Sequence, residues 1–401
     1  MSFHTDGEHL GPKGQHRVVR TSEVLIPPHA TICRRSPRNP DRQQSNYHDL
    51  FDSHTVFCDV FNTDAGIAMI GPPLLNLEST FLEATYTIDG QVFPVSTFPL
   101  NRAQRTQITA MHADSLRIDF GEYNVEAAVR SPMNSLFRGR NVLVAMQRNN
   151  PLRWIEEWAR LYVAVNKVDA LILYDLRSTD YTLTELREVL VAIPGLECSV
   201  IVHWPFKYGV KPKFAGDPWD SDFGQYVAWE HAYRRFLQEA RAVTVSDVDE
   251  VFLAQDGRSI FDHAAESATG VVRFRQRFIE PVVHRAPTSG KDTSYSDYSL
   301  FEPARALSTP KYAAILERLH HGHQLLVHSI AGDRTAETDQ IIGRQFEAMK
   351  LAWDRGNFDR KHPDKPFDPT TNLVVDDVLM HAVRRSADAR KNPPEQGFER
   401  S

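Results

Sequence analysis

Between residues 140 and 253 the chain alternates apolar runs of strand length with amphipathic helical stretches. The apolar runs predict strands at Asn141 to Met146, Ala170 to Tyr174, Cys198 to Trp204 and Ala242 to Val245. Between them, one apolar stripe at helical spacing consists of Trp154, Ile155, Trp158, Leu161 and Tyr162. This alternation predicts an α/β fold built on a mixed, mainly parallel sheet.

Local signals place the starts of three helices in this region. Asn150 followed by Pro151 is typical of an N-cap and first helical residue. Thr182 with a glutamate three positions later is the spacing of a capping box. Asp222, three residues before Gln225, has the same spacing, and we therefore interpret Asp222 as the N-cap of a helix. That helix carries Tyr226, Trp229, Tyr233, Phe236 and Leu237 on one side.

The region before residue 140 has a different pattern, with short runs of alternating apolar and polar residues separated by turn residues. Asp89-Gly90 is a two-residue hairpin signal. We expect a small β-rich, sandwich-like domain over residues 46–135, preceded by a partly ordered segment over residues 1–45. Its predicted strands are Thr55 to Phe61, Phe81 to Ile88, Gln91 to Phe98, Ser115 to Phe120 and Val125 to Val129.

Beyond residue 253 the pattern is less regular. It predicts a strand at Val271 to Phe278, a loop at Pro287 to Ser299, and helices near Thr338 to Trp353 and Leu373 to Arg385. The polar composition from Ser386 onward predicts a disordered tail over residues 386–401. The main domain is therefore expected to span residues 140–385.

Composition narrows the classes of protein that this chain can belong to. No stretch has the roughly 18 apolar residues that a membrane span requires, although peripheral association with a membrane stays open. The polar first 20 residues are unlike a signal peptide, and three widely spaced cysteines argue against a disulfide framework. These features favour a cytoplasmic protein. A formal net charge of −6 gives no support to nucleic-acid binding, and the sequence leaves the oligomeric state open.

The strongest chemical signal is Asp247-Val248-Asp249-Glu250, which follows the apolar run that ends at Val245. In an extended segment, residues two apart point to the same side, so both aspartates are expected to face one divalent cation. Two carboxylates suit Mn²⁺ or Mg²⁺, which take further ligands from water and substrate phosphates. The pattern predicts a metal and phosphate site at the end of this strand.

Several motifs in this stretch together resemble the glycosyltransferase family 92-like group, which is similar to family 2 glycosyltransferases of the A-type fold. The resemblance covers residues 141–253 well and residues 311–328 loosely, and it departs from the group's pattern at Asn150, Tyr162 and Lys167. The matching motifs are Asn149 to Leu152, Glu157-Trp158, Tyr174-Asp175, Ser178-Thr179-Asp180, Gln225 and Asp247 to Leu253.

The resemblance implies roles for individual residues. Asn149 and Asp175 correspond to contacts with the donor nucleoside, with Ser178 and Asp180 supporting the same loop. Gln225 and Ser246 are also expected at the donor, and Asp247 with Asp249 are expected to hold the metal. Two of these residues have a structural alternative, since Asp175 could cap a turn and Gln225 could complete the capping box of Asp222.

His328 ends an apolar run at Gln324 to Val327, and the resemblance places a histidine about there, so we expect His328 as a third metal ligand or a phosphate partner. His320, His321 and His323 are interpreted as an exposed turn. An inverting transfer needs a carboxylate to accept the proton of the acceptor hydroxyl. Among Glu280, Asp292 and Asp297, we favour Asp297 as this base.

The resemblance implies a metal-dependent enzyme that transfers a hexose, with inversion, from a nucleotide-diphosphate sugar, commonly UDP-linked. The acceptor class that we expect is a glycan or a lipid-linked glycan, as in polysaccharide biosynthesis. Two alternatives remain open: a nucleotidyl or phosphosugar transferase, and a glycan-binding protein without catalytic activity.

Overall fold

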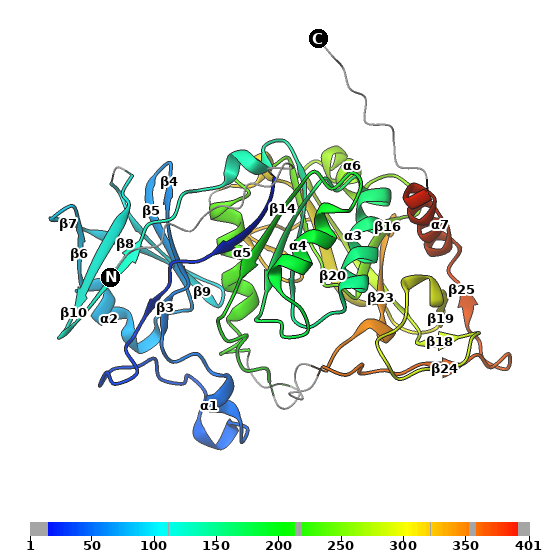
Figure 1. Ribbon diagram of the computed structural model, residues 1–401, viewed down its shortest axis with the longest axis horizontal. Coiled ribbons are helices and arrows are strands. Elements are labelled where there is room, and N and C mark those ends of the chain that lie inside the picture. Colours follow the sequence, from blue (N-terminus) through cyan, green and yellow to red (C-terminus); the bar gives the residue numbers. More distant parts are fainter. Residues whose placement is uncertain are drawn as a thin grey trace, which may run out of the picture.

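The computed structural model describes residues 15–391, apart from residues 111, 213–215, 217, 218, 321 and 353–357. A nine-stranded mixed sheet forms its centre (Figure 1). In spatial order its strands are β1 (His16–Arg20), β14 (Cys198–His203), β13 (Ala170–Asp175), β12 (Asn141–Gln147), β15 (Ala242–Val245), β20 (Ser308–Ile315), β17 (Val271–Ile279), β23 (Ile341–Phe346) and β16 (Glu250–Ala254).

The first five strands of this order are parallel, which confirms the four strands predicted between residues 140 and 253. All six residues of β13 are buried, as expected for a strand that is covered on both faces. The sequence pattern did not reveal β1, which pairs in parallel with β14 at the edge of the sheet. Because the strands are parallel, the residues that follow β12, β13 and β15 meet at one edge of the sheet.

The other half of the sheet is largely antiparallel, and it contains the clearest error of the sequence prediction. The strand at Val271 to Phe278 is confirmed as β17, but the helix predicted near Thr338 is wrong. There the chain forms β23, which pairs with both β16 and β17. The apolar residues of β23 satisfy a helical spacing and a strand spacing equally well, so pairing with distant strands decides the outcome. Trp353, the end of that predicted helix, lies outside the described residues.

Helices cover both faces of the central sheet. The apolar stripe of α3 is confirmed, since its residues from Trp154 to Tyr162 at the predicted positions are all buried. However, α3 begins at Leu152 with Pro151 as its N-cap, so Asn150 is not the cap. The capping box at Thr182 and Glu185 is confirmed at the start of α4. The helices are α1 (Tyr47–Leu50), α2 (Glu78–Leu82), α3 (Leu152–Asn166), α4 (Leu183–Val191), α5 (Gly224–Arg235), α6 (Ile260–Glu266) and α7 (Asp377–Lys391).

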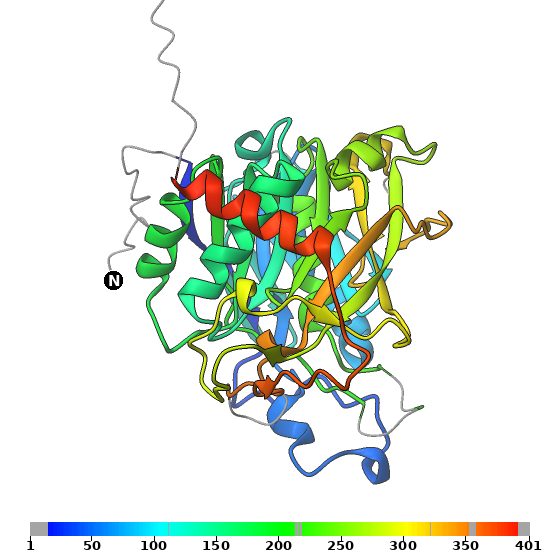
Figure 2. The same cartoon turned by 90° about the vertical axis from the view of Figure 1, so that its right-hand side faces the viewer.

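The last helix packs across α3, as Figure 2 shows for the red helix in front of the green one. It confirms a helix near the predicted position, but it continues to Lys391. The prediction that disorder begins at Ser386 is therefore wrong for residues 386–391, and residues 392–401 lie outside the described part of the chain. Buried Leu379 and Ala382 attach α7 to the main core, which explains why the helix is held in place.

Residues 59–128 form two four-stranded antiparallel sheets that enclose a separate apolar core (Figure 1, left). The hairpin at Asp89-Gly90 is present, and both residues have positive φ, as a two-residue turn of this kind requires. The strand predicted from Phe81 is wrong at its start, because Phe81 belongs to α2. In spatial order the strands are β11 (Tyr123–Ala128), β10 (Ser115–Phe120), β6 (Thr85–Ile88) and β7 (Gln91–Phe93) in one sheet, and β4 (Asp59–Thr63), β5 (Gly66–Gly71), β9 (Ala103–Ile108) and β8 (Val95–Leu100) in the other.

The second of these sheets also packs against the main body of the protein. Phe61, Ala68 and Ile70 share a core cluster with Trp204 and Trp229, and α5 lies between this sheet and the central sheet (Figure 1). The independence of the β-rich region as a domain therefore stays a prediction. Short two-stranded pairs complete the structure: β2 (Val24–Leu25) with β3 (Thr55–Phe57), β18 (Val282–Val283) with β24 (Lys365–Pro366), β19 (Leu300–Phe301) with β25 (Val374–Val375), and β21 (Gln324–Leu325) with β22 (Ile330–Ala331).

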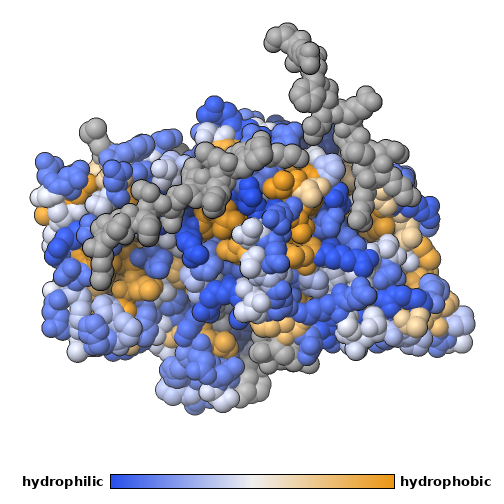
Figure 3. Space-filling model, viewed as in Figure 1, coloured by the Kyte–Doolittle hydropathy of each residue, from blue (hydrophilic) through white to orange (hydrophobic). Residues whose placement is uncertain are grey.

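On the face seen in Figure 3, hydrophilic residues predominate and hydrophobic residues occur as separate patches. Within the described residues, none of the helices has the length and apolar character needed to cross a membrane.

Candidate functional site

The segment from Asp247 to Glu250 is a tight turn between β15 and β16. The backbone N–H of Glu250 donates to the carbonyl of Asp247 at 3.0 Å, and residues 248 and 249 have turn conformation. The extended geometry expected from the sequence is therefore replaced by a turn. Both aspartates nevertheless line the same cleft, so the carboxylates still face one space.

Aromatic side chains from other elements hold the backbone of this turn. The Trp158 indole donates to the carbonyl of Glu250 at 3.0 Å, and the Tyr295 hydroxyl donates to the carbonyl of Val248. The Tyr162 hydroxyl donates to Ser246 at 2.8 Å. Because these donors are buried, they fix the position of the turn against the core.

Lys311, which comes from β20, completes the turn on its inner side. Its Nζ lies 2.7 Å from Glu250 Oε2 and 3.5 Å from Asp247 Oδ2, and the side chain is only 2 % exposed. Gln276 donates to the other carboxylate oxygen of Glu250 at 2.9 Å. Although burial lowers the pKa of Lys311, Glu250 and Asp247 raise it above its ordinary value, so the lysine is charged. Lys311 therefore neutralises Glu250 and leaves the two aspartates as the open acidic groups.

The carboxylate of Asp249 differs from its neighbours, because among the described residues it receives neither a hydrogen bond nor an ion pair. Burial raises its pKa to about 7, helped by the negative charges of Glu250 and Asp247. Lys350 and Lys311 oppose this rise through their positive charge. A carboxylate with a raised pKa and no partner is strongly stabilised in its charged form by a cation that binds next to it.

The cleft beside the turn has a volume of about 160 Å³ and opens to solvent. Besides the two aspartates it is lined by Asn150, Tyr208 and Gln225, and by basic side chains. Those basic residues are Lys211, Lys350 and Lys361. A cleft with both acidic and basic groups suits a polar ligand that carries phosphate.

Gln225 joins the wall of the cleft to the aspartate pair. Its Nε2 donates to Asp247 Oδ1 at 3.3 Å, and its Oε1 accepts from the Tyr208 hydroxyl at 3.0 Å. The capping-box alternative is wrong, because α5 begins at Gly224 with Phe223 as its N-cap and without a side-chain cap. Asp222 is instead buried, and burial raises its pKa to about 6.

Three other predicted donor contacts form a network around the loop after β13. The side-chain oxygen of Asn149 accepts from the backbone N–H of Thr179 at 2.7 Å. Asp175 is fully buried and accepts from Gln147 and from the Ser178 hydroxyl, the latter at 2.6 Å. Asp180 is half exposed and pairs with Lys291 at 3.4 Å. These residues order the loop, but they do not line the cleft that holds Asp247.

His328 lies in a bend between β21 and β22, and its Nδ1 is 3.2 Å from the carbonyl oxygen of Pro310. Partial burial and the positive charge of Lys311 together lower its pKa to about 4, while Asp247 opposes this shift. His328 is thus close enough to Lys311 and Asp247 for both charges to shift its pKa, and its ring is neutral. In the described part of the chain, no group of three or more histidine, cysteine, aspartate or glutamate side chains is arranged to hold a metal ion.

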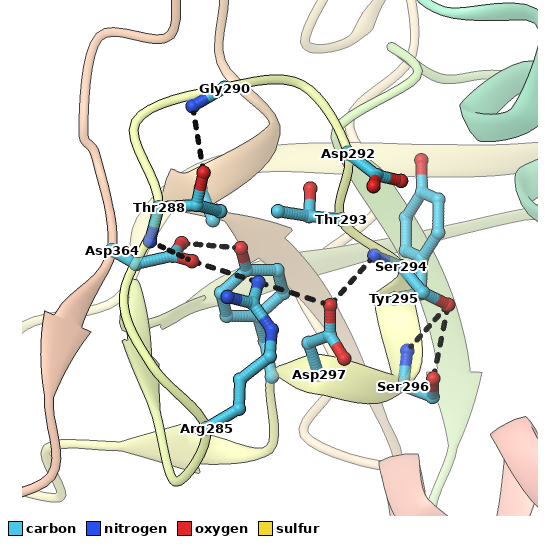
Figure 4. A network of polar contacts seen from close by, with 12 residues as sticks. Arg285, Thr288, Gly290, Asp292, Thr293, Ser294, Tyr295, Ser296, Asp297 and Asp364 are labelled. Atoms are coloured by element: carbon cyan, nitrogen blue, oxygen red, sulfur yellow. Dashed lines mark hydrogen bonds and ion pairs between the residues drawn. The ribbon is translucent and has the colours of Figure 1, made fainter.

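Asp297 lies away from the cleft, in the network drawn in Figure 4. Its carboxylate caps the short turn at Ser294, accepting from that backbone N–H at 2.9 Å, and it pairs with Arg285 at 3.2 Å. Arg285 also pairs with Asp364 at 2.8 Å. The structure does not bring Asp297 together with Asp247 and Asp249. Of the other two carboxylates weighed as the base, Asp292 is almost fully exposed and Glu280 pairs with Arg305.

A divalent cation fits the turn as a partly protein-bound ion. Asp247 and Asp249 supply two oxygen-donor side chains at a solvent-open cleft, and the remaining positions would belong to water and phosphate oxygens. The charges of Asp247, Asp249 and Glu250, less that of Lys311, leave two negative charges for one such ion.

Sequence reasoning missed Lys311, Lys350 and Lys361. A lysine inside an apolar strand such as β20 is a usable signal, because lysine is almost never fully buried without a partner. The cleft lysines Lys211, Lys350 and Lys361 follow no local pattern.

Comparisons with known proteins leave the family open. No family model matches the chain, and no curated protein matches it. One solved structure that matches is that of an active-site mutant of LgtC, at 14% sequence identity and a TM-score of 0.22. The match covers 44% of this chain and 58% of that chain, so less than two thirds of its length. A likeness this weak carries no argument about function, and the resemblance to the family 92-like group stays a prediction.

Proposed function

We propose that this protein is a metal-dependent glycosyltransferase that transfers a hexose from a nucleotide-diphosphate sugar, UDP-linked, to a glycan or lipid-linked glycan. The observation that carries the proposal is the pair Asp247 and Asp249 at one cleft, with the Asp249 carboxylate lacking a counter-charge in contact. The basic residues that line the same cleft favour a diphosphate as the ligand.

In this proposal, Asp247 and Asp249 hold Mn²⁺ or Mg²⁺, and Gln225 orients Asp247 through its 3.3 Å hydrogen bond. The bound ion would supply stabilisation of the negative charge that develops on the leaving diphosphate. Lys311 and the buried aromatic donors keep the turn fixed, so that the carboxylates need no rearrangement during the reaction.

The proton acceptor is a separate question. Asp297 remains the proposed base on the grounds of sequence, although its carboxylate is committed to Ser294 and Arg285. If Asp297 is the base, Asp297→Asn reduces transfer to an acceptor while binding of the donor is retained. If the variant transfers normally, another carboxylate accepts the proton.

A panel of nucleotide sugars with Mn²⁺, with and without chelator, tests the function. We expect slow hydrolysis of one donor that requires the metal and that falls by about 100-fold or more in Asp249→Asn. Asp64→Asn, at an exposed turn between β4 and β5, is the matched control and should behave like the wild type.

The two alternatives predict other outcomes of the same panel. Glycan binding without interaction with any nucleotide sugar would support a non-catalytic glycan-binding protein. Turnover of nucleoside triphosphates with sugar phosphates would support a nucleotidyl transferase. Either result would overturn the proposal.

A further inference from the structure

Lys350 and Lys361 lie next to each other on one wall of the cleft. The backbone N–H of Lys361 donates to the carbonyl of Lys350 at 2.7 Å, and the neighbouring residues Leu351 and Arg360 form an antiparallel bridge. Both lysine side chains are half-buried. Two ammonium groups are therefore presented to the cleft by one short antiparallel pair.

The buried side chain of Arg360 anchors this pair to the rest of the protein. It donates to the carbonyls of Ala348 at 2.7 Å and Gly290 at 3.0 Å, and it pairs with Asp364. Gly290 and Asp364 belong to the network of Figure 4, which joins the loop after β18 to the segment before β24. The wall that carries the lysines is therefore fixed in place.

Several basic side chains share one carboxylate along this wall. The carboxylate of Glu347 is shared by Lys350 at 2.6 Å, His362 at 3.4 Å and Arg305 at 3.6 Å. The ring of Phe278 lies 5.3 Å from Lys350 Nζ and 3.6 Å from the Arg305 guanidinium, which packs both cations on one aromatic face. Arg305 is also paired with Glu280, and burial lowers the pKa of His362, so Lys350 and Lys361 are the cations of this wall that line the cleft.

We propose that Lys350 and Lys361 form an anion subsite that binds a diphosphate directly, without the divalent cation. The identity of the anion, the diphosphate of the sugar donor, rests on the proposed function. The lysines, which line the same cleft as Asp247 and Asp249, contact phosphate oxygens, and the protein therefore retains a nucleoside diphosphate when no metal is present. Two ammonium groups suit this anion because each donates charge-assisted hydrogen bonds to phosphate oxygens.

Titration calorimetry of the full chain with inorganic pyrophosphate in the presence of EDTA tests the subsite. We expect the wild type to bind pyrophosphate, and Lys350→Met with Lys361→Met to weaken binding by about 10-fold or more. The double change to arginine should restore binding. Lys167→Met removes one positive charge from a residue whose side chain is 70 % exposed at the end of α3, and it should have no effect. Thermal unfolding of each variant identifies any loss of fold.

Asp249→Asn separates this proposal from the proposed function. It should keep pyrophosphate binding in EDTA while losing metal-dependent donor hydrolysis. The subsite is overturned if the wild-type protein does not bind pyrophosphate in EDTA, or if the double methionine variant binds it normally. Neither result contradicts the transferase proposal. Lysine-dependent binding of pyrophosphate without turnover of any nucleotide sugar supports the subsite and overturns the transferase.

Discussion

The cluster around Asp59 and the turn around Asp249 both place carboxylates inside the protein, but only the first surrounds its carboxylate with fixed partners. Asp59 on β4 accepts from His231 at 2.8 Å, from Arg235 at 2.7 Å and from the backbone of Ser22 at 2.6 Å. The second nitrogen of His231 is 2.7 Å from the Tyr174 hydroxyl. The Asp59, His231 and Tyr174 side chains are fully buried, and the cluster connects the β-rich region to α5.

The pKa shifts show the same contrast. Burial alone would raise the pKa of Asp59, but the charge of Arg235 and the hydrogen bond from His231 more than offset it, so the pKa is lowered. At Asp249, burial and neighbouring carboxylates raise the pKa to about 7, and no cation touches it. A complete cluster stabilises the fold, whereas an incomplete one at a cleft indicates a ligand that is bound during function.

Removing one member of the complete cluster should have the largest effect. Arg235→Met leaves Asp59 buried without its main counter-charge, so we expect a loss of about 3–5 kcal/mol in the free energy of unfolding. Urea denaturation measures this loss. Arg138→Met is the control, because its ion pair with Glu239 is at the surface, and it should cost less than about 1 kcal/mol. Similar losses in both variants would contradict the comparison.

Binding of a metal ion next to Asp249 should stabilise the folded protein. Mn²⁺ at 100 times its Kd is expected to raise the free energy of unfolding by about 2.7 kcal/mol, since it binds the folded state. Thermal unfolding with and without Mn²⁺ measures the gain. In Asp249→Asn the gain should disappear, whereas Arg235→Met should keep it. An equal gain in Asp249→Asn would show that the ion binds elsewhere.

A smaller effect is expected from Gln225, which orients Asp247. Gln225→Ala should weaken Mn²⁺ binding by about 10-fold, because residues that hold a metal ligand contribute at this level. Electron paramagnetic resonance of free Mn²⁺ during a titration measures the affinity. Gln91→Ala, on the exposed strand β7, should leave it unchanged. Unchanged affinity in Gln225→Ala would mean that Asp247 is oriented without this contact.

The smallest expected effect, about 1 kcal/mol after screening by solvent, is a pH dependence of stability. Because the folded pKa of Asp249 is raised from its ordinary value of 3.8 to about 7, the folded state binds the proton more tightly. Its contribution to stability is complete below about pH 4 and is lost as the pH rises through about 7. Asp249→Asn should flatten this part of the urea-derived pH profile, and Mn²⁺ should flatten it in the wild type. A profile that is identical in the variant would contradict the raised pKa.

Local sequence patterns correctly predicted those helices and strands whose structure depends mainly on residues close in sequence. The stripe from Trp154 to Tyr162, the capping box at Thr182 and the buried parallel strands were all predictable, because each has one dominant period or cap. The placement of Asp247 and Asp249 at one cleft was predictable for the same reason, as they follow a buried strand. Their turn conformation was not, because it depends on donors from distant elements such as Tyr295.

Features that depend on pairing between strands distant in sequence could not be predicted from local patterns. Lys311 reaches Asp247 across 64 positions of sequence because β20 pairs with β15. The segment after Thr338 became β23 because two strands were available to pair with it. Asp297 was attractive as an acidic residue in a polar loop, but its position three residues after Ser294 is equally typical of a cap, and the structure has the cap.

The edge strand β1 has a consequence for how the protein is assembled during synthesis. Its residue His16 meets Ser199, 183 positions later, so β1 leaves the ribosome long before its only neighbour in the sheet exists. β1 therefore stays unpaired on the nascent chain until β14 has been synthesised, and this edge of the sheet forms late. In the folded protein, residues 16–20 cover the edge of β14. Their deletion would leave the backbone N–H and C=O groups of that edge unpaired and promote aggregation.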